Sequence, residues 1–452
     1  MQSISSNLLR LAAVALVDVL GNRGPADVKL SWFFKQNREL GTKDRAFVAE
    51  SVYGVLRRKA LLSHLAEGED PRKLLLAWLL RVQGHSLREL DGALNKQQLE
   101  WAHAIKAVST DALPPAVQAD LPEWLWQWLS AQYGEAEALV IARSMHQPAP
   151  LDLRVNLIKA TREEVQAKLA SENTEIVPTP YSPQGLRMTQ KMNISRHPWF
   201  MEGKFEVQDE GSQLLAQLVA PRRGQMVADF CAGAGGKSLA LGAIMRNSGR
   251  IYAFDVSEKR LLNLGQRLKR SGLSNLHSQL ITSENDPKLK RLDGKFDRVL
   301  VDAPCSGLGT LRRNPDLKWR MTEQDLTELV AKQAGILARA ARLVKPGGRL
   351  VYATCSLLQQ ENEQQAQAFL SAHPQFVLVP AGPLLAQQQV ALDTGDFLQL
   401  LPHKHQTDGF FAAVFERAAT VGAPAAAADE AEADKVVAEV EVTDKAEADT
   451  QP

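Results

Sequence analysis

Residues 226–238 read Met226-Val-Ala-Asp-Phe-Cys-Ala-Gly-Ala-Gly-Gly-Lys-Ser238, an apolar run followed by a glycine-rich loop and a helical pattern. The run predicts a buried strand, and the glycines allow the backbone to approach a ligand with a helix N-terminus behind it. Strand and helix patterns alternate from here to residue 417, which predicts a doubly wound, mostly parallel α/β sheet. We expect its strands at 226–230, 250–255, 277–281, 296–302, 349–354 and 410–415.

The glycine loop resembles two nucleotide-binding motifs and matches neither. A phosphate-binding P-loop needs glycine where Cys231 stands, and the dinucleotide fingerprint needs a glycine-like residue at Ser238. Asp255 ends the second strand, where a carboxylate accepts hydrogen bonds from ribose hydroxyls, and Asp229 adds negative charge near the loop. Acidic groups repel phosphates and suit a cationic cofactor that carries ribose. S-adenosylmethionine fits this description, and a glycine turn used only for tight packing is the alternative.

Two cysteines follow the ends of predicted strands, in the phrases Asp302-Ala-Pro-Cys305-Ser306 and Thr354-Cys355-Ser356. Ligands bind at the carboxyl ends of parallel strands, so both thiols should reach one crevice. The alternative is that both are small buried apolar residues, as many free cysteines are.

A thiolate that adds to carbon 6 of a pyrimidine makes carbon 5 nucleophilic enough to take a methyl group. Asp302 is placed to hold cytosine, and Lys237 is the nearest cation that could activate a thiol. The base must leave its stack, which favours single-stranded RNA or a flipped base.

Composition agrees with a cytoplasmic protein that has an anionic partner. Three cysteines argue against a disulfide framework, and the apolar stretch Leu8–Leu20 is too short to span a membrane, so it predicts a packed helix. Residues 419–452 carry nine acidic and two basic side chains, so the net charge of +1 leaves +8 on residues 1–418. We expect no metal ion and a monomer.

Four segments follow from composition. Residues 1–145 read as helical, with Thr42 as an N-cap; 146–204 form a small α+β module; 205–418 form the α/β domain; and 419–452 are a disordered acidic tail. The Arg57–Lys59 cluster favours a solvated helix face over phosphate contact, and the tryptophans at 124, 126 and 128 favour core over RNA stacking. Arg154 and Asn156 could touch a phosphate or simply lie at a solvated strand edge.

The motifs together resemble the Sun (Fmu-type) family of RNA cytosine-5 methyltransferases, of the ribosomal RNA small subunit methyltransferase B type. The resemblance is carried by Asp229–Lys237, Asp302–Thr310 and Thr354–Ser356, and is supported by Phe205–Ser212 and Asp408–Phe411. It implies a class I S-adenosylmethionine-dependent methyltransferase fold, preceded by an all-helical NusB-like RNA-binding domain and a small RNA-recognition-like module.

The resemblance also implies roles. Cys355 would attack carbon 6, Cys305 would assist product release, and 16S ribosomal RNA would be the substrate. The cofactor site would be lined by Cys231, Ala232, Gly233, Ala234, Gly235, Gly236, Lys237, Asp255 and Asp302, with Asp302 also facing the base. Relatives carry Gly-Asp after the third strand to contact adenine; here Glu284 aligns best, with Asn285 or Asp286 as alternatives.

The segment 311–320 holds four basic residues and a tryptophan beside the predicted crevice, which favours RNA contact or a lid over a solvated loop. Three alternatives remain for the whole chain. It could methylate transfer RNA, it could be a non-catalytic RNA-binding assembly factor on the same fold, or, least favoured, it could be a P-loop nucleotidase.

Overall fold

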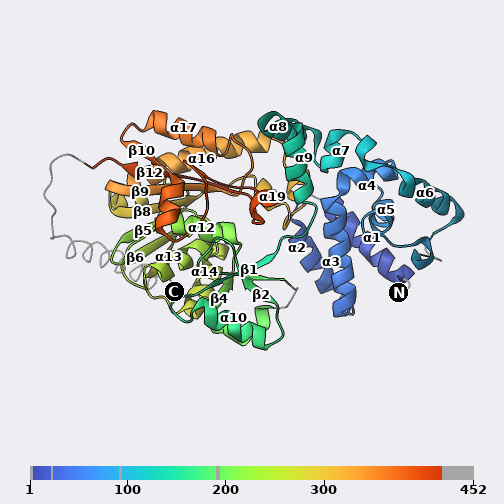
Figure 1. Cartoon of the computed structure of the whole chain (residues 1–452), viewed down its shortest axis with the longest axis horizontal. Coiled ribbons are helices and arrows are strands. Elements are labelled where there is room, and N and C mark those ends of the chain that lie inside the picture. Colours follow the sequence, from blue (N-terminus) through green and yellow to red (C-terminus); the bar gives the residue numbers. More distant parts are fainter. Residues whose placement is uncertain (1–3, 22–23, 91–93, 190–193, 420–452) are drawn as a thin grey trace, which may run out of the picture.

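The computed structural model describes residues 4–21, 24–90, 94–189 and 194–419 and arranges them as three adjoining parts (Figure 1). A helical part lies at one end, a large α/β part at the other, and a small sheet beside the latter. The predicted acidic tail falls, from residue 420 onward, outside the described residues.

The helical part has a core built by amphipathic helices. The predicted helix over Leu8–Leu20 is confirmed, and its Ala12 and Leu16 are buried. Thr42 is the first residue of its helix, and Gly41 is the N-cap, so the prediction of Thr42 as a cap is wrong by one residue. The longer helices are α1 (Ser6–Leu20), α2 (Ala26–Gln36), α3 (Thr42–Arg57), α4 (Lys59–Ala66), α5 (Pro71–Arg81) and α6 (Lys96–Ala107).

Three further helices, α7 (Pro115–Ala119), α8 (Glu123–Tyr133) and α9 (Glu135–Ser144), share a core with the α/β part. Leu125 and Trp126 are buried there against Leu308 and Leu357. The core interpretation of the tryptophans is confirmed for Trp126, whereas its two neighbours are partly buried and pack edge to face on each other.

The small part is an antiparallel sheet of strand order β2-β3-β1-β4, with one long helix against it. Its elements are β1 (Leu151–Val155), α10 (Arg162–Ser171), β2 (Ile176–Pro178), β3 (Gly185–Met188), α11 (Pro198–Met201) and β4 (Phe205–Val207). Both readings of Arg154 and Asn156, phosphate contact and solvated edge, are wrong. Both residues are buried, and Asn156 donates to the carbonyls of Gly203 and Ser271.

The large sheet has the order β10-β12-β9-β8-β5-β6-β7, with β11 paired to β12. The strands from β9 to β7 are parallel, and β12 runs antiparallel to its neighbours. The strands are β5 (Met226–Asp229), β6 (Arg250–Asp255), β7 (Leu276–Leu280), β8 (Phe296–Asp302), β9 (Val344–Thr354), β10 (Phe376–Val379), β11 (Leu398–Leu400) and β12 (Phe410–Arg417).

Helices cover both faces of this sheet. One face packs on α12 (Glu210–Val219), α13 (Gly236–Ile244), α14 (Glu258–Ser271) and α18 (Ala381–Gln387). The other packs on α16 (Glu323–Leu343) and α17 (Glu363–Ala372). The short helix α19 (Pro402–His405) lies toward the helical part (Figure 1). The short helix α15 (Leu317–Arg320) contacts that part directly, because Trp319 bonds the Leu56 carbonyl.

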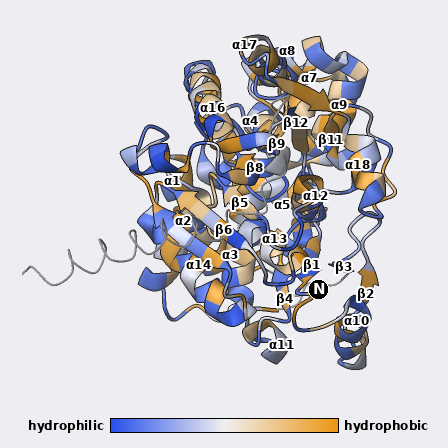
Figure 2. Cartoon of the chain, turned by 90° about the vertical axis from the view of Figure 1, so that its left-hand side faces the viewer, coloured by the Kyte–Doolittle hydropathy of each residue, from blue (hydrophilic) through white to orange (hydrophobic). Residues whose placement is uncertain are grey.

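Burial on both faces explains why the strands are continuous apolar runs, as in β12, where the first six residues are buried (Figure 2). β9 begins five residues before its predicted start because Val344 pairs with Phe296 of β8. The next pair is Arg298 with Arg349, so the Lys-Pro-Gly-Gly sequence between the two pairs forms a bulge, in which Gly347 has a positive φ.

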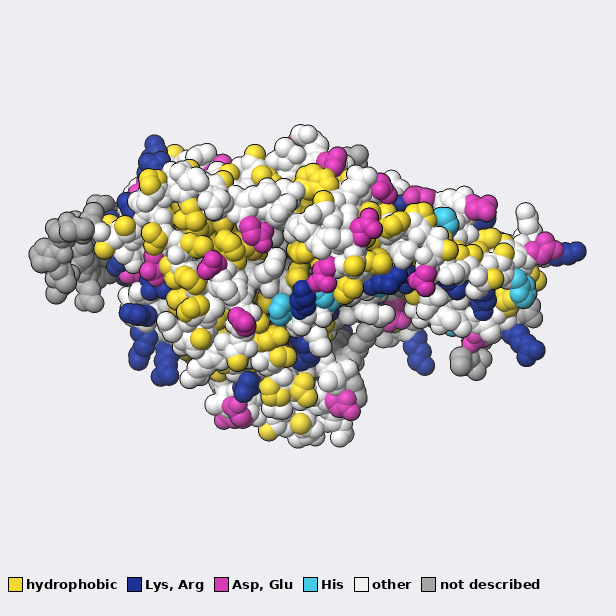
Figure 3. All heavy atoms as spheres, turned by 45° about the horizontal axis from the view of Figure 1, so that its top comes forward, with side chains coloured by type: hydrophobic (Ala, Val, Ile, Leu, Met, Phe, Trp, Pro, Cys, Tyr) yellow, Lys and Arg dark blue, Asp and Glu magenta, His cyan; other side chains and the backbone are white. Residues whose placement is uncertain are grey.

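On the face in Figure 3, acidic and basic side chains are interspersed among apolar ones. Within the described ranges, none of the helices is both long and apolar enough to cross a membrane.

Candidate active site

The glycine loop follows β5 and curls over the end of β6. The backbone N–H of Gly233 donates to the Asp255 carboxylate at 2.8 Å, which fixes the loop to the second strand. Gly235 has φ +78°, and a Cβ atom there would lie 1.8 Å from Leu264. At Gly233 a Cβ atom would meet nothing within 4 Å, so that side of the loop is open to a ligand.

Two buried carboxylates lie under this loop. Asp229 and Asp255 are 1% and 5% exposed. Asp229 accepts a hydrogen bond from the Ser238 hydroxyl at 2.7 Å through Oδ2, while its buried Oδ1 has no partner in the described structure. Burial raises the pKa of Asp229 to about 6, opposed by that hydrogen bond and reinforced by the charges of Asp302 and Asp255.

This arrangement fits S-adenosylmethionine. An unpartnered buried carboxylate oxygen favours a ligand that brings positive charge, and an open glycine loop at a helix start admits close backbone contact. Cys231, in the same loop, is partly buried, and burial raises the pKa of its thiol, so it stays a neutral lining residue.

Lys237 and Asp302 form an ion pair of 2.6 Å at the ends of α13 and β8. Burial opposes the charge of Lys237, but Asp302 outweighs it, and the pKa of Lys237 is raised. The charges of Asp229 and Cys355 act in the same direction, each with a smaller effect. Lys237 is therefore a cation fixed by Asp302.

The two thiols meet, as the strand-end argument predicted. β8 and β9 are parallel neighbours, with Asp302 in register with Ala353, and the Sγ atoms of Cys305 and Cys355 are 3.3 Å apart. Both are free and partly buried. The backbone N–H of Cys355 donates to Cys305 Sγ at 3.3 Å. The hydrogen bond with Cys355 and burial raise the pKa of Cys305 well above its usual range, so Cys305 holds its proton.

The turn after β7 reduces the number of candidate residues for the predicted contact with adenine. Asp286 is buried, and it accepts bonds from the backbone N–H groups of Thr282 and Lys288 at 2.9 Å each, so it caps the turn. Its pKa is lowered, first by the bond from Thr282. Glu284 and Asn285 are less buried and remain the candidates.

The basic segment 311–320 is a joint between the helical and α/β parts. The prediction of RNA contact is wrong for Arg312 and Lys318, which are 8% and 4% exposed. Arg57 Nη2 donates to the Arg312 carbonyl at 3.1 Å, and Lys318 Nζ to the Arg57 carbonyl at 3.0 Å. Trp319 Nε1 donates to the Leu56 carbonyl at 2.6 Å.

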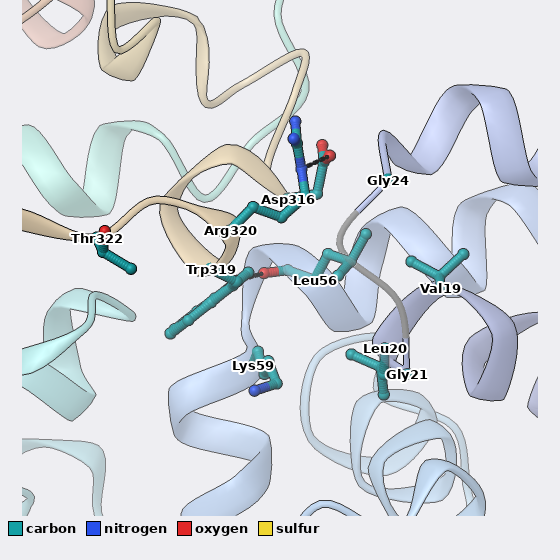
Figure 4. Close-up of a pocket in the computed structure, with 10 residues that line it drawn as sticks. All are labelled: Val19, Leu20, Gly21, Gly24, Leu56, Lys59, Asp316, Trp319, Arg320 and Thr322. Carbon is teal, nitrogen blue, oxygen red and sulfur yellow. Dashed lines mark hydrogen bonds and ion pairs between the residues drawn. The ribbon is translucent and has the colours of Figure 1, made fainter. Parts of the chain in front are cut away.

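The Arg57–Lys59 cluster belongs to the same region. Its predicted solvated face is wrong for Arg57, which is buried, and Arg58 pairs with the buried Asp120 at 2.6 Å. A pocket of about 210 Å³ lies at this joint (Figure 4). Its lining, which includes Lys59, Trp319 and Arg320, contains none of the predicted cofactor or thiol residues.

Sequence reasoning missed a polar network behind the thiols. Ser306 and Ser356, the residues after the two cysteines, both donate to the carboxylate of Glu361. Glu361 precedes α17 and gives no sequence signal distinct from an acidic residue near a helix start. The loop after Cys355 is also held from α8, because Gln132 donates to the Leu357 carbonyl and accepts from Gln359 N–H, each at 3.0 Å.

Comparisons with known proteins show which family this chain belongs to. A family model described as "16S rRNA methyltransferase RsmB/F" matches residues 216–416, and one described as "Methyltr_RsmF/B-like, ferredoxin-like domain" matches 121–195. A probable ribosomal RNA small subunit methyltransferase B of Synechocystis is 33% identical over 90% of this chain and 99% of its own length. The chain belongs to the RsmB/F family.

Other relatives support this membership. A probable methyltransferase B of Bacillus subtilis is 29% identical over 89% of this chain and 96% of its own length. The solved structure of a methyltransferase homologue from Pyrococcus horikoshii is similar at TM-score 0.59 and 29% identity, over 69% of this chain and 100% of that one. A further solved structure aligns at TM-score 0.74 and 27% identity over 92% of this chain and 99% of that one.

Family membership confirms the resemblance inferred from the motifs and the predicted fold class. This RsmB/F protein is an S-adenosylmethionine-dependent rRNA methyltransferase with a helical N-terminal region, a ferredoxin-like domain and a class I methyltransferase sheet. The ferredoxin-like match begins at residue 121, within the part that we assigned to the helical domain; our boundary after residue 145 stays a prediction.

Proposed function

We propose that this RsmB/F protein forms 5-methylcytosine in 16S ribosomal RNA, in the cytoplasm, through a covalent bond between Cys355 and carbon 6 of the base. The observation that carries the proposal is the thiol pair at 3.3 Å, with the Lys237–Asp302 ion pair beside it. The proposed substrate comes from the names of the relatives, which are ribosomal RNA small subunit methyltransferases.

The cofactor, when bound, supplies the methyl group. The loop 231–237, Asp229 and Asp255 would hold it, with Glu284 proposed at the adenine. Asp302 would accept the exocyclic N–H of cytosine while Lys237 compensates its charge. The Cys355 thiolate forms a bond to carbon 6, carbon 5 takes the methyl group, a base removes the carbon 5 proton, and the C6–S bond breaks to restore the thiolate and the aromatic ring.

The proximity of Cys305 to Cys355 supports a role of Cys305 in the release step. While Cys355 carries negative charge, the hydrogen bond with it keeps Cys305 protonated. Once Cys355 is bonded to carbon 6, that charge is gone, so the main cause of the raised pKa of Cys305 is removed. Cys305 can then give its proton to water and, as a thiolate, take the carbon 5 proton, while the C6–S bond breaks and its electron pair returns to Cys355.

The test pairs two alanine variants with labelled cofactor and 16S RNA. We expect Cys355→Ala to transfer no methyl group, and Cys305→Ala to accumulate a protein–RNA adduct that survives denaturation. Full turnover by Cys355→Ala would refute the mechanism.

Bisulfite sequencing of cells with and without the gene tests the substrate. Loss of a 16S site supports the proposal. Loss of a transfer RNA site would favour that RNA instead, and no methyl transfer by the wild type would favour a non-catalytic assembly factor.

A further inference from the structure

Glu361 is a buried carboxylate between the two cysteine loops. It is 0% exposed, and its partners are neutral donors. Oε1 accepts from the Ser306 N–H at 2.8 Å and from Gln333 Nε2 at 2.9 Å. Oε2 accepts from the Ser306 hydroxyl at 2.5 Å and from the Ser356 hydroxyl. Four hydrogen bonds replace the water that a carboxylate loses on burial, so the group is held in one orientation.

Its partners are the residues next to the thiols. Ser306 follows Cys305, Ser356 follows Cys355, and the two hydroxyls are themselves 3.0 Å apart. One carboxylate oxygen therefore ties together two loops that lie 50 residues apart in sequence. The carboxylate thus holds the residue that follows each cysteine, and in this way it fixes the distance between the two thiols.

The neighbours of Glu361 extend this arrangement. Gln333 donates to the carbonyl of Pro304, the residue before Cys305, at 3.0 Å. Asn362 accepts from the Thr354 hydroxyl at 2.5 Å and donates to the Ser356 carbonyl at 3.1 Å, on either side of Cys355. Each thiol is thus fixed by side chains that bond the residues before and after it.

We infer that Glu361 is a positioning residue that sets the distance and orientation of the Cys305–Cys355 pair without touching either sulfur. Its effect on turnover rests on the proposed function, whereas its effect on thiol geometry does not. Misplacement of a reacting group by about 1 Å costs on the order of 10²-fold in rate, and Glu361 is the group that links both loops.

The test compares Glu361→Gln with Glu363→Gln, the same change two residues further on, where the carboxylate accepts a hydrogen bond from Gln399 at 3.3 Å and bonds neither cysteine loop in the described structure. The amide in Glu361→Gln keeps one accepting oxygen and replaces the other with an NH2 donor, so it cannot accept all four hydrogen bonds. Thiol geometry is measured as the rate at which phenylarsine oxide bridges the two cysteines. In this reaction two As–S bonds replace the As–O bond, and the two thiol protons leave with the oxygen as water. This bridging needs both thiols and no cofactor or RNA.

We expect Glu361→Gln to slow bridging and to lower kcat by roughly 10²-fold, with KM for cofactor and RNA within about twofold of wild type. Glu363→Gln should match wild type in both assays. Bridging at the wild-type rate, or loss of activity only in proportion to unfolded protein in a thermal melt, would overturn the inference.

Ser356→Ala provides a second variant should Glu361→Gln fold poorly. It removes one donor and keeps the carboxylate, so we expect a smaller loss in bridging and kcat. The double variant should lose less than the product of the two single effects, because both act through one network. Independent effects would overturn the inference. If the wild-type protein transfers no methyl group but Glu361→Gln still bridges more slowly than wild type, the positioning role stands and only the proposed function is refuted.

Discussion

The affinity for S-adenosylmethionine should depend on pH through Asp229. Burial raises the pKa of this carboxyl to about 6, so the folded protein without cofactor ionises it only as pH rises through that value. The ionised form, with its unpartnered Oδ1, is the one that attracts a cation. Binding should therefore strengthen as pH rises and weaken as pH falls through about 6.

The magnitude follows from the fraction of ionised Asp229. With a pKa of about 6, roughly nine-tenths of the carboxyl is ionised at pH 7 and roughly one-tenth at pH 5. If only the ionised form binds tightly, the dissociation constant rises about tenfold between these pH values, and binding at pH 6 releases about half a proton.

Isothermal titration calorimetry in buffers of different ionisation enthalpy measures both quantities. Asp229→Asn is the matched control, since it cannot ionise there and retains an oxygen that can accept from Ser238. The Asn variant should bind the cofactor more weakly than wild type at pH 7. Its affinity should depend less on pH, and its binding should not release the proton that Asp229 releases in the wild type. Titration of the cofactor's own amino group affects both proteins equally. Parallel pH profiles for the two proteins would contradict the assignment of Asp229 to the cofactor site.

Three further predictions concern contacts around the site. Asp302→Asn should lower kcat by on the order of 10²-fold. It should also lower the pKa of Lys237, because it removes the charge that outweighs burial, and a shifted pH–rate profile would show this change. An unchanged kcat would exclude Asp302 from the site that holds the base. Gln132→Ala should lower kcat while the cofactor dissociation constant stays within about twofold, because Gln132 bonds the loop after Cys355. An equal loss of cofactor binding in calorimetry would contradict this. Lys318→Met should raise the thermal midpoint: burial lowers the pKa of Lys318 to about 7, below its value in the unfolded chain, so the destabilisation by this lysine grows as pH falls toward 7 and is fully present below that pH. The gain should be larger at pH 6 than at pH 9, and a melt with the opposite order would refute it.

The features predicted correctly are those that local sequence determines. The parallel strands are buried on both faces, so they read as apolar runs, and a strand that ends at a cysteine delivers that cysteine to a known edge of the sheet. The loop 231–236 is recognisable because its glycines are required where the backbone turns, as at Gly235 against Leu264. The proximity of Lys237 to Asp302 follows from the pairing of β5 with β8, since the loop after β5 leads to Lys237 and Asp302 ends β8.

Features that depend on distant partners could not be predicted in this way. Lys318 lies in a basic segment with a tryptophan, which is typical of RNA contact, yet its ammonium bonds a carbonyl 261 residues away. Arg57 reads as part of a basic helix face and is buried by the same joint. Glu361 bonds two serines whose proximity exists only once β8 and β9 pair.

The two cysteines, similar in sequence, become different in the fold. The peptide N–H of Cys355 donates to the sulfur of Cys305, and no such backbone bond to the sulfur of Cys355 is found among the described residues. The hydrogen bond with Cys355 and burial raise the pKa of Cys305, so Cys305 is the thiol that holds its proton. This asymmetry supports the proposal that Cys355 is the nucleophile. In that proposal, the hydrogen bond that keeps Cys305 protonated is lost when Cys355 becomes a thioether, so a single contact would order attack before release.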